Sequence, residues 1–308
     1  MSPLLPSPFA LASIAGLALA TFPTLCEAAT FADADDYNTF VLGDMTSTYV
    51  DTEGRVAIGG NADLTGYGVG SKFSTVPTTA GNALVVGGNL AYHSGEVHYG
   101  SLVYGGTLSG SPSVPNGTIS QGNPIDFAST REYLLGASSY WASLAANGST
   151  VAQYGGITLT GTDPSLNVFS LSGLALASSS SLNINAPAGS TVLVNIDGSS
   201  NSFQYMGVNL ASGGTDRQHV VYNFFESTSL AINGISVQGT VLAPQAALTF
   251  GNGNIEGHVM VDSFIGSGEA HHYPFLGSLP AMTVPEPAAA TGLASLLILS
   301  CASRRRRD

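Results

Sequence analysis

LVVGGN at residues 84–89 follows VAIGGN at residues 56–61 and precedes LVYGGT at residues 102–107. These three fragments share a short apolar run that ends in paired glycines. The step from Gly87 to Gly105 is about 18 residues, and the step from Gly59 to Gly87 is longer by about ten. Short apolar strands separated by glycine at a regular step are typical of a β-solenoid, in which each rung stacks on the next.

The same step recurs near the C-terminus. VQGTVLA at 237–243 is echoed by IEGHVMV at 255–261, so that Gly239 and Gly257 repeat the spacing of Gly87 and Gly105. In the longer N-terminal step, the Gly-, Ser-, Thr- and Pro-rich stretch 65–80 supplies a ten-residue insertion. We therefore predict an all-β fold, a β-helix with about 18 residues per rung and glycine in corner conformations closed to other residues. A two-sheet β-sandwich is the alternative, although it predicts no constant step.

The composition agrees with an all-β protein and excludes two other classes. The chain of 308 residues is 44% hydrophobic and 9% charged, with 38 Gly, whereas a disordered chain would be more charged and less apolar. A helical protein would carry more amphipathic runs of Glu, Lys, Leu and Ala. Four of the eight Lys and Arg are Arg304 to Arg307 at the C-terminus, and the rest of this chain of net charge −12 lacks the basic clusters that bind nucleic acid.

One segment breaks the β pattern. Residues 127–146 contain apolar side chains at positions that fit a helix with one buried face. Asp126 or Ser129 is the candidate N-terminal cap, and Asn147-Gly148 the candidate end. We expect this helix to lie along the outside of the solenoid. Trp141, the only tryptophan, is then expected to pack in the core and not to contact a ligand.

The N-terminus resembles a secretory signal peptide. The chain is almost entirely apolar from Phe9 to Phe22, and small residues around Ala29 suit cleavage, which gives a signal peptide at 1–29. No Lys or Arg precedes the apolar run, so an uncut membrane anchor is the alternative. The two cysteines, Cys26 and Cys301, lie near the two ends, and the body between them has no disulfide.

The C-terminus has the features of a membrane-targeting tail. Residues 288–303 are uncharged and predict a short transmembrane helix, and four arginines follow it: Arg304, Arg305, Arg306 and Arg307. Such a cluster stops export and places the C-terminus in the cytoplasm. Four residues precede the helix: Val284, Pro285, Glu286 and Pro287. Together these parts resemble the PEP-CTERM sorting signal of Gram-negative bacteria, so we assign the tail to 281–308. A plain tail anchor would leave the Pro-Glu-Pro motif unexplained.

The body resembles a second family. YNTFVLGD at 37–44 and GRVAIGGNADL at 54–64 resemble the opening of the choice-of-anchor A domain, and GTVLAPQAAL at 239–248 and EAHHYPFLGSLP at 269–280 resemble its closing pattern. We assign residues 30–280 to this domain. The resemblance implies an adhesive domain on secreted bacterial proteins, similar to β-solenoid ice-binding proteins, without a catalytic motif. The tail resemblance implies processing by an exosortase during transient insertion in the inner membrane.

Few residues are candidates for metal or acid-base chemistry. Asp33, Asp35 and Asp36, together with Asp44, are candidate oxygen ligands for calcium, but no EF-hand loop accompanies them. A solvated acidic cluster is favoured, so we predict no metal and no cofactor. No pair of histidines has the spacing of a helical zinc motif among His93, His98, His219, His258, His271 and His272. His271 and His272 are expected to cap or pack the closing end of the domain.

These observations favour a non-enzymatic surface or extracellular-matrix protein. Solenoid enzymes that cleave polysaccharides need carboxylates near Arg or Lys, and no such pairing stands out in the body. The leading hypothesis is an exported adhesin that binds extracellular polysaccharide or neighbouring cell surfaces. An ice-binding solenoid and a polysaccharide-cleaving enzyme are the alternatives. For ice binding, Thr158 and Thr160 alternate, as do Asn183 and Asn185, but the sequence does not join them into a ladder.

Overall fold

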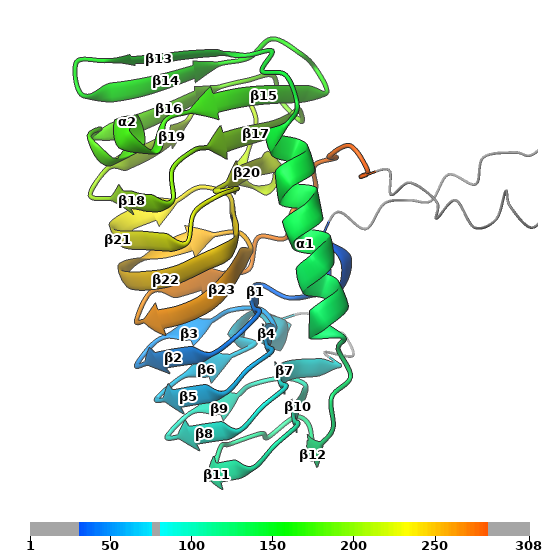
Figure 1. The fold of residues 1–308 in the computed structure, drawn as a ribbon. Helices are drawn as coiled ribbons and strands as arrows, with labels where there is room; N and C mark the ends of the chain where they lie inside the picture. Colours follow the sequence, from blue (N-terminus) through cyan, green and yellow to red (C-terminus); the bar gives the residue numbers. More distant parts are fainter. Residues whose placement is uncertain (1–30, 76–80, 283–308) are drawn as a thin grey trace, which may run out of the picture.

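The computed structural model describes residues 31–75 and 81–282. They form a β-solenoid whose stacked rungs are flanked by one long helix, α1 (Phe127–Ala142) (Figure 1). Neighbouring rungs pair as parallel strands, and only the hairpin of β13 (Ser149–Gln153) and β14 (Gly156–Thr160) pairs antiparallel strands within a sheet. Because a β-sandwich consists of two antiparallel sheets, this pairing confirms the predicted β-helix and its flanking helix.

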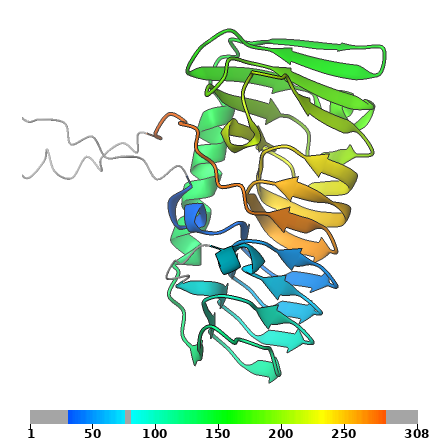
Figure 2. The same cartoon turned by 180° about the vertical axis from the view of Figure 1, so that it is seen from behind.

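The rungs do not stack in the order of the sequence. The chain starts in the middle of the solenoid, where β1 (Thr39–Val41) pairs with β4 (Val56–Ile58) on one side and β23 (Val259–Gly266) on the other. It winds to one end at β12 (Ile119–Gln121). Helix α1 then runs beside the middle rungs, and the chain continues from it to the far end (Figures 1 and 2). The remaining rungs descend to meet the first one. The two halves of the sequence therefore share one continuous stack.

Each rung offers strands at up to three positions. The first position lies beneath α1 and is formed by β1, β4, β7 (Asn82–Val86), β10 (Ser101–Tyr104), β12, β15 (Leu166–Leu171), β17 (Thr191–Ile196), β20 (Val220–Asn223) and parts of β22 (Thr240–Glu256) and β23. The second is formed by β2 (Met45–Thr48), β5 (Ala62–Thr65), β8 (Leu90–His93), β11 (Leu108–Gly110), β18 (Ser200–Gln204), and parts of β21 (Ser229–Val237), β22 and β23. The third includes β3 (Asp51–Thr52), β6 (Gly68–Val69), β9 (Glu96–Val97) and β24 (Glu269–His271).

Shorter elements complete the fold. A four-stranded sheet at the far end contains β13, β14, β16 (Ser181–Asn185) and β19 (Gly207–Leu210). A short helix, α2 (Gly173–Ala177), packs against β18. Three 3-10 helices are present in the described residues: η1 (Ala32–Asp36), η2 (Ser71–Thr75) and η3 (Arg217–His219).

The predicted rung length holds in one part of the solenoid. Strand register places Leu84 beside Leu102 and Val241 beside Val259, which is the predicted step in both halves of the sequence. Toward the far end the rungs are longer, since the register there pairs Leu166 with Thr191.

The predicted insertion in the N-terminal half is also confirmed. Ahead of it, Asp51 of β3 pairs with Gly68 of β6, a step close to the predicted one. The insertion falls between β6 and β7, so that Val56 of β4 pairs with Leu84 of β7, considerably further along the chain. The rung therefore absorbs the extra residues outside its paired strands.

The paired glycines serve a purpose other than the one predicted. Gly59, Gly87 and Gly105 are absent from the residues with positive φ, so they are not the left-handed corners of the rungs. They stack on one another instead. A Cβ atom on Gly87 would lie 2.5 Å from the carbonyl oxygen of Gly59, and one on Gly105 would lie 2.1 Å from that of Gly87. Glycine is required here because the backbones of successive rungs approach too closely for a side chain.

Replacing Gly87 with alanine is therefore expected to destabilise the protein by about 2–3 kcal/mol, since backbone must move to admit the methyl group. Chemical denaturation followed by circular dichroism measures the loss. The matched control is Gly122→Ala, because a Cβ there meets nothing closer than Val103 Cγ1 at 3.6 Å. If the Gly87→Ala protein were as stable as this control, the backbones of neighbouring rungs would be able to move apart without loss of stability, which contradicts the prediction.

Helix α1 agrees with the prediction at its start and differs at its end. Asp126 caps it, its side chain accepting a hydrogen bond of 3.0 Å from the backbone N–H of Ser129. The helix ends at Ala142 and not at residue 146, because Asn147 bonds the first-position strand β15 through Val168 N–H and Leu166 O. Its buried stripe includes small and polar residues as well as the predicted apolar ones, since it lies close against the sheet: Thr130, Leu134, Ala137, Ser138 and Trp141.

The predicted signal peptide at 1–29 and the sorting residues 284–287 and 304–307 lie outside the described residues. So does the predicted transmembrane helix at 288–303. Within 31–75 and 81–282, no helix has the length and apolar character needed to cross a membrane.

Candidate functional site

One long side of the solenoid is left uncovered. At the first position, α1 packs on the strands β20 and β22, and all three residues of β4 are buried. At the second position, buried and exposed residues alternate, as in β2 and β5. Alternation of this kind marks a sheet with one face in the core and the other in solvent. We call the outer surface of the second-position strands β18, β21, β22, β23, β2, β5, β8 and β11 the open face.

The outward side chains of the open face form a continuous row. Strand register aligns one residue from each rung, from β18 to β11: Ser202, Ala231, Thr249, Ile265, Thr46, Asp63, Ala91 and Ser109. Most of these side chains are short. Since neighbouring strands lie about 4.8 Å apart, the row runs for roughly 34 Å along the solenoid.

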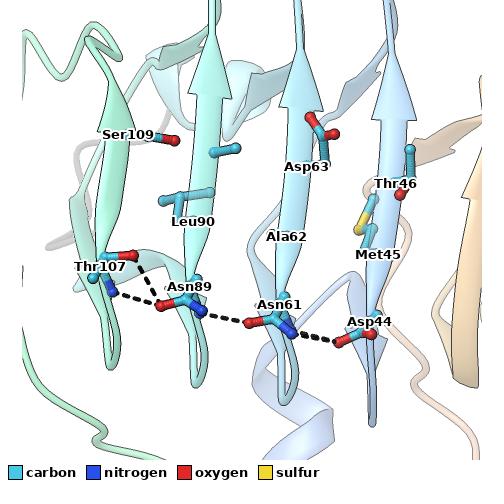
Figure 3. Close-up of a pocket in the computed structure, with 11 residues that line it drawn as sticks. Asp44, Met45, Thr46, Asn61, Ala62, Asp63, Asn89, Leu90, Thr107 and Ser109 are labelled. Carbon is cyan, nitrogen blue, oxygen red and sulfur yellow. Dashed lines mark hydrogen bonds between the residues drawn. The ribbon is translucent and has the colours of Figure 1, made fainter.

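A second row, at one edge of the open face, is linked by hydrogen bonds (Figure 3). Asp44 accepts from the backbone N–H of Asn61 at 2.7 Å, and Asn61 Oδ1 accepts from the N–H of Asn89 at 2.9 Å. Asn89 Oδ1 accepts from both the N–H and the hydroxyl of Thr107 at 2.9 Å. Each side chain thus bonds the next rung and fixes the edge of the sheet.

Two hollows lie on the open face. The first, of about 290 Å³, is bordered by this ladder and by the outward residues Thr46, Asp63, Ala91 and Ser109. The second, of about 300 Å³, lies between β18 and β23 and includes Ala231, Asn233 and Thr249. The first is lined by carboxylate, amide, hydroxyl and apolar groups, and the second by amide, hydroxyl and apolar groups, so both offer hydrogen bonds to a polar partner.

The open face lacks the charge pairing that polysaccharide cleavage needs. Its first hollow has two carboxylates, Asp44 and Asp63, and no basic residue. No Lys or Arg of the described residues lies on an open-face strand. Arg131 of α1 bonds Asp262 at 2.6 Å, and Arg217 of η3 forms an ion pair with Glu256.

The structure separates the candidate calcium ligands. Asp33, Asp35 and Asp36 lie in η1, where Asp33 accepts from Thr130 of α1 at 3.3 Å and Asp35 from the N–H of Phe31 at 3.0 Å. Asp44 belongs to the ladder on the open face. Within the described part of the chain, no group of three or more His, Cys, Asp and Glu side chains is placed to hold a metal ion.

His258 lies where the first and last segments of the domain meet. It is buried, its Nδ1 lies 2.7 Å from the carbonyl oxygen of Tyr37, and its Nε2 accepts from the N–H of Phe275 at 3.0 Å. This pattern fits the neutral ring with a proton on Nδ1. Burial lowers the pKa of His258 to about 4. The residue therefore closes the domain as an uncharged hydrogen-bonding bridge.

His271 and His272 take part in the same closure, as predicted. His271 Nδ1 lies 2.8 Å from Glu256 Oε1, and the N–H of His272 donates to Glu53 at 2.9 Å. Burial lowers the pKa of both rings, but for His271 the hydrogen bonds of Glu256 and Glu269 and the charges of Glu256 and Glu53 outweigh burial, so its pKa is raised. For His272 burial prevails and the pKa is lowered. Of the other histidines, His93 lies on the open face, and His98 and His219 pair with Glu96 and Asp216.

Two tyrosines at the border of the open face were missed by the sequence analysis. Tyr49 and Tyr205 are 80% and 69% exposed, and each directly follows an open-face strand. The structure also places side by side some of the alternating Thr and Asn residues that the sequence did not connect into a ladder. Thr158 lies beside Asn183, and Asn183 beside Asn209, whose side chain donates to Asn183 at 3.0 Å. This short ladder lies on β14, β16 and β19, away from the open face.

A family model described as "Putative Ice-binding-like adhesive domain" matches residues 30–272. The chain belongs to this family. Membership agrees with the adhesive domain expected from the sequence, whereas the PEP-CTERM signal concerns residues outside the described part and stays a prediction. Among curated proteins, nothing matches the chain.

Several solved structures resemble this one in outline. An ice-binding protein from an Antarctic biological consortium is 18% identical, with 78% of this chain and 88% of that chain covered and a TM-score of 0.40. A domain of a Shewanella frigidimarina ice-binding protein is 12% identical, with 81% and 97% covered and a TM-score of 0.42. An Arctic yeast ice-binding protein is 10% identical, with 82% and 96% covered and a TM-score of 0.30. At these values nothing about binding transfers to this chain.

Proposed function

We propose that the protein is an exported, non-enzymatic adhesin whose open face binds extracellular polysaccharide or the surface of neighbouring cells. The observation that carries this proposal is the open face itself, a row of mostly short side chains eight strands long that no other element of residues 31–75 and 81–282 covers. A regular array of hydroxyl and amide groups makes repeated weak contacts with a repeating polar partner. The adhesive family to which the chain belongs supports the same function.

The route to the cell surface belongs to the proposal. The signal peptide at 1–29 directs export from a Gram-negative cell, and the tail at 281–308 holds the chain transiently in the inner membrane. An exosortase then processes the tail near Pro285-Glu286-Pro287. Intact mass and fractionation of the native protein test this route. Loss of the residues after about 284 supports sorting, and an intact tail in the inner membrane contradicts it.

Binding is tested with purified protein on microcrystalline cellulose, chitin and alginate beads, and on whole bacterial cells. Thr249→Arg places a long charged side chain in the centre of the open face and is expected to weaken binding at least tenfold. The matched control is Glu132→Arg, on the exposed side of α1. Failure of the unchanged protein to bind any of these surfaces would contradict adhesion.

Ice binding is the second candidate function. The regular spacing of the open face and the two threonines of its outward row, Thr46 and Thr249, favour it, while Asp63 and Ile265 interrupt the row. A measurement of thermal hysteresis decides between the two functions. Hysteresis that Thr249→Arg abolishes would support ice binding, and its absence would leave adhesion. A reducing-end assay on acidic polysaccharides tests the third alternative, a glycan-cleaving enzyme.

A further inference from the structure

The corner at which the open-face strands end has an unusual backbone. From β18 to β8, every rung except that of β23 has a residue in the left-handed region at this corner, with φ between 47° and 61°: Tyr205, Gly234, Asn252, Tyr49, Gly66 and Ser94. Glycine, asparagine and serine suit such a site, because their side chains are absent or short. Tyrosine does not, since a bulky side chain in this conformation costs about 1–2 kcal/mol.

Both tyrosines are held in the same way. A Cβ atom on Gly66 would lie 2.8 Å from Tyr49 Cδ1, and a Cβ on Gly234 would lie 2.6 Å from Tyr205 Cδ1. Each tyrosine ring therefore packs directly on the glycine of the next rung. Asn233 fixes the second ring further, as its Nδ2 donates to Tyr205 Oη at 2.7 Å. Most of each side chain nevertheless faces solvent.

The distance between the two tyrosine rings is one that an extended ligand can bridge. The strands β18, β21, β22, β23 and β2 pair in this order, so the two tyrosines are four rungs apart, or about 19 Å at 4.8 Å per strand. Between them, Gly234 and Asn252 occupy the same corner. No bulky side chain stands at these two positions, so an extended ligand can reach both rings.

A different cause explains the third exposed tyrosine with positive φ. Tyr154 is 99% exposed and lies with Gly155 at the two-residue turn between β13 and β14. Hairpin turns of this length require positive φ at both central residues. The turn explains the backbone of Tyr154, but register places Tyr154 two rungs beyond Tyr205 on the same side of the solenoid, since Gly156 pairs with Ser181 and Ser181 with Gly207. Tyr154 is therefore not used as a control for the corner.

We propose that Tyr49 and Tyr205 are paired stacking sites for one extended polysaccharide chain that runs along the corner of the open face. This inference rests on the proposed adhesive function and names its sugar-binding residues. The face of a sugar ring presents C–H groups, which are attracted to the negative face of an aromatic ring. Sugar hydroxyls then meet the amides and hydroxyls beside the rings, including Asn233, Asn252 and Thr48. A net charge of −12 favours a neutral glycan over an acidic one.

The test replaces each tyrosine with asparagine, singly and together, in the whole protein. Asparagine tolerates the left-handed backbone, so Tyr49→Asn and Tyr205→Asn should leave the melting temperature unchanged or raised. The probes are cellohexaose and chitohexaose in solution, with cellulose and chitin beads beside them. We expect each single variant to bind these probes several-fold more weakly and the double variant at least tenfold more weakly. The control Glu132→Asn, on the exposed side of α1, is expected to bind like the unchanged protein.

The outcomes separate this inference from the proposed function. If the unchanged protein binds cellulose or chitin and the double variant binds equally well, the stacking sites are wrong and adhesion stands. The proposal also expects the two rings to contribute separately to binding. If each stable single variant lost as much binding as the double variant, the two contacts would not be additive, and this part of the proposal would be wrong. A lower melting temperature in both asparagine variants would show that the two rings stabilise the folded protein and are not there to bind a ligand. If the unchanged protein binds none of these surfaces or cells, the proposed function fails and the inference falls with it.

Discussion

Replacing Trp141 with alanine is expected to lower the free energy of unfolding by about 3–5 kcal/mol, the usual loss for a buried aromatic residue. Trp141 is 2% exposed, lies edge-on to Phe31 at 5.7 Å, and donates from Nε1 to the carbonyl oxygen of Pro280 at 2.9 Å. The side chain thus ties α1 to the beginning and the end of the described chain. Urea denaturation followed by far-ultraviolet circular dichroism measures the loss.

Trp141→Phe separates the two contributions, because it keeps an aromatic ring and removes the N–H donor. We expect this variant to fall between the alanine variant and the unchanged protein. Tyr140→Ala is the neighbouring control, since its side chain is only partly buried against the same cluster. Equal losses for Trp141→Ala and Tyr140→Ala would contradict a special role for Trp141 in joining the three segments.

Acid is expected to destabilise the protein through His258. Its pKa is about 4 in the folded state against an ordinary value of 6.5, so the unfolded chain binds the proton more readily between these values. Stability is therefore highest above pH 6.5 and falls as the pH drops toward 4, by about 3 kcal/mol from this residue. Protonation of Nε2 also removes the acceptor for the N–H of Phe275.

The contribution of His258 is isolated by comparing the unchanged protein with His258→Gln across this range. His272, with its lowered pKa, acts in the same direction, whereas His271, with its raised pKa, adds stability at low pH that is lost as the pH rises. Denaturation curves at pH 7, 5.5 and 4 measure the difference. If the two proteins lose stability in parallel, His258 is not the acid-sensitive group.

Much of the fold was predictable because each rung is encoded by a short repeat of neighbouring residues. The apolar runs that end in Gly59, Gly87 and Gly105 identified the rungs and their regular step, which the register confirms at Leu84 and Leu102. Asp126 also marked the start of α1 correctly. The reason for the glycines was not predictable, since the contact that a Cβ on Gly87 would make with the carbonyl oxygen of Gly59, at 2.5 Å, arises only when the rungs stack.

The candidate site was much less predictable. The outward residues of the open face, such as Thr46 and Ile265, are adjacent only because β2 pairs with β23, which lies near the opposite end of the domain sequence. Tyr49 and Tyr205 gave no signal in the sequence, because neither their shared corner nor their positive φ can be read from neighbouring residues. The same holds for His258, whose bonding partners are Tyr37 and Phe275.

The sequence by itself determined the rung and the helix, because strand alternation, glycine spacing and helix capping depend on residues close together in the chain. Only the tertiary structure decided the order of the rungs and which side of the solenoid stays open. Every rung presents a similar parallel edge of backbone hydrogen-bonding groups, so the local sequence does not determine which two rungs will pair. The choice follows from α1, which carries the chain to the far end, and from the packing of Phe31, Trp141 and His258 where the two halves join.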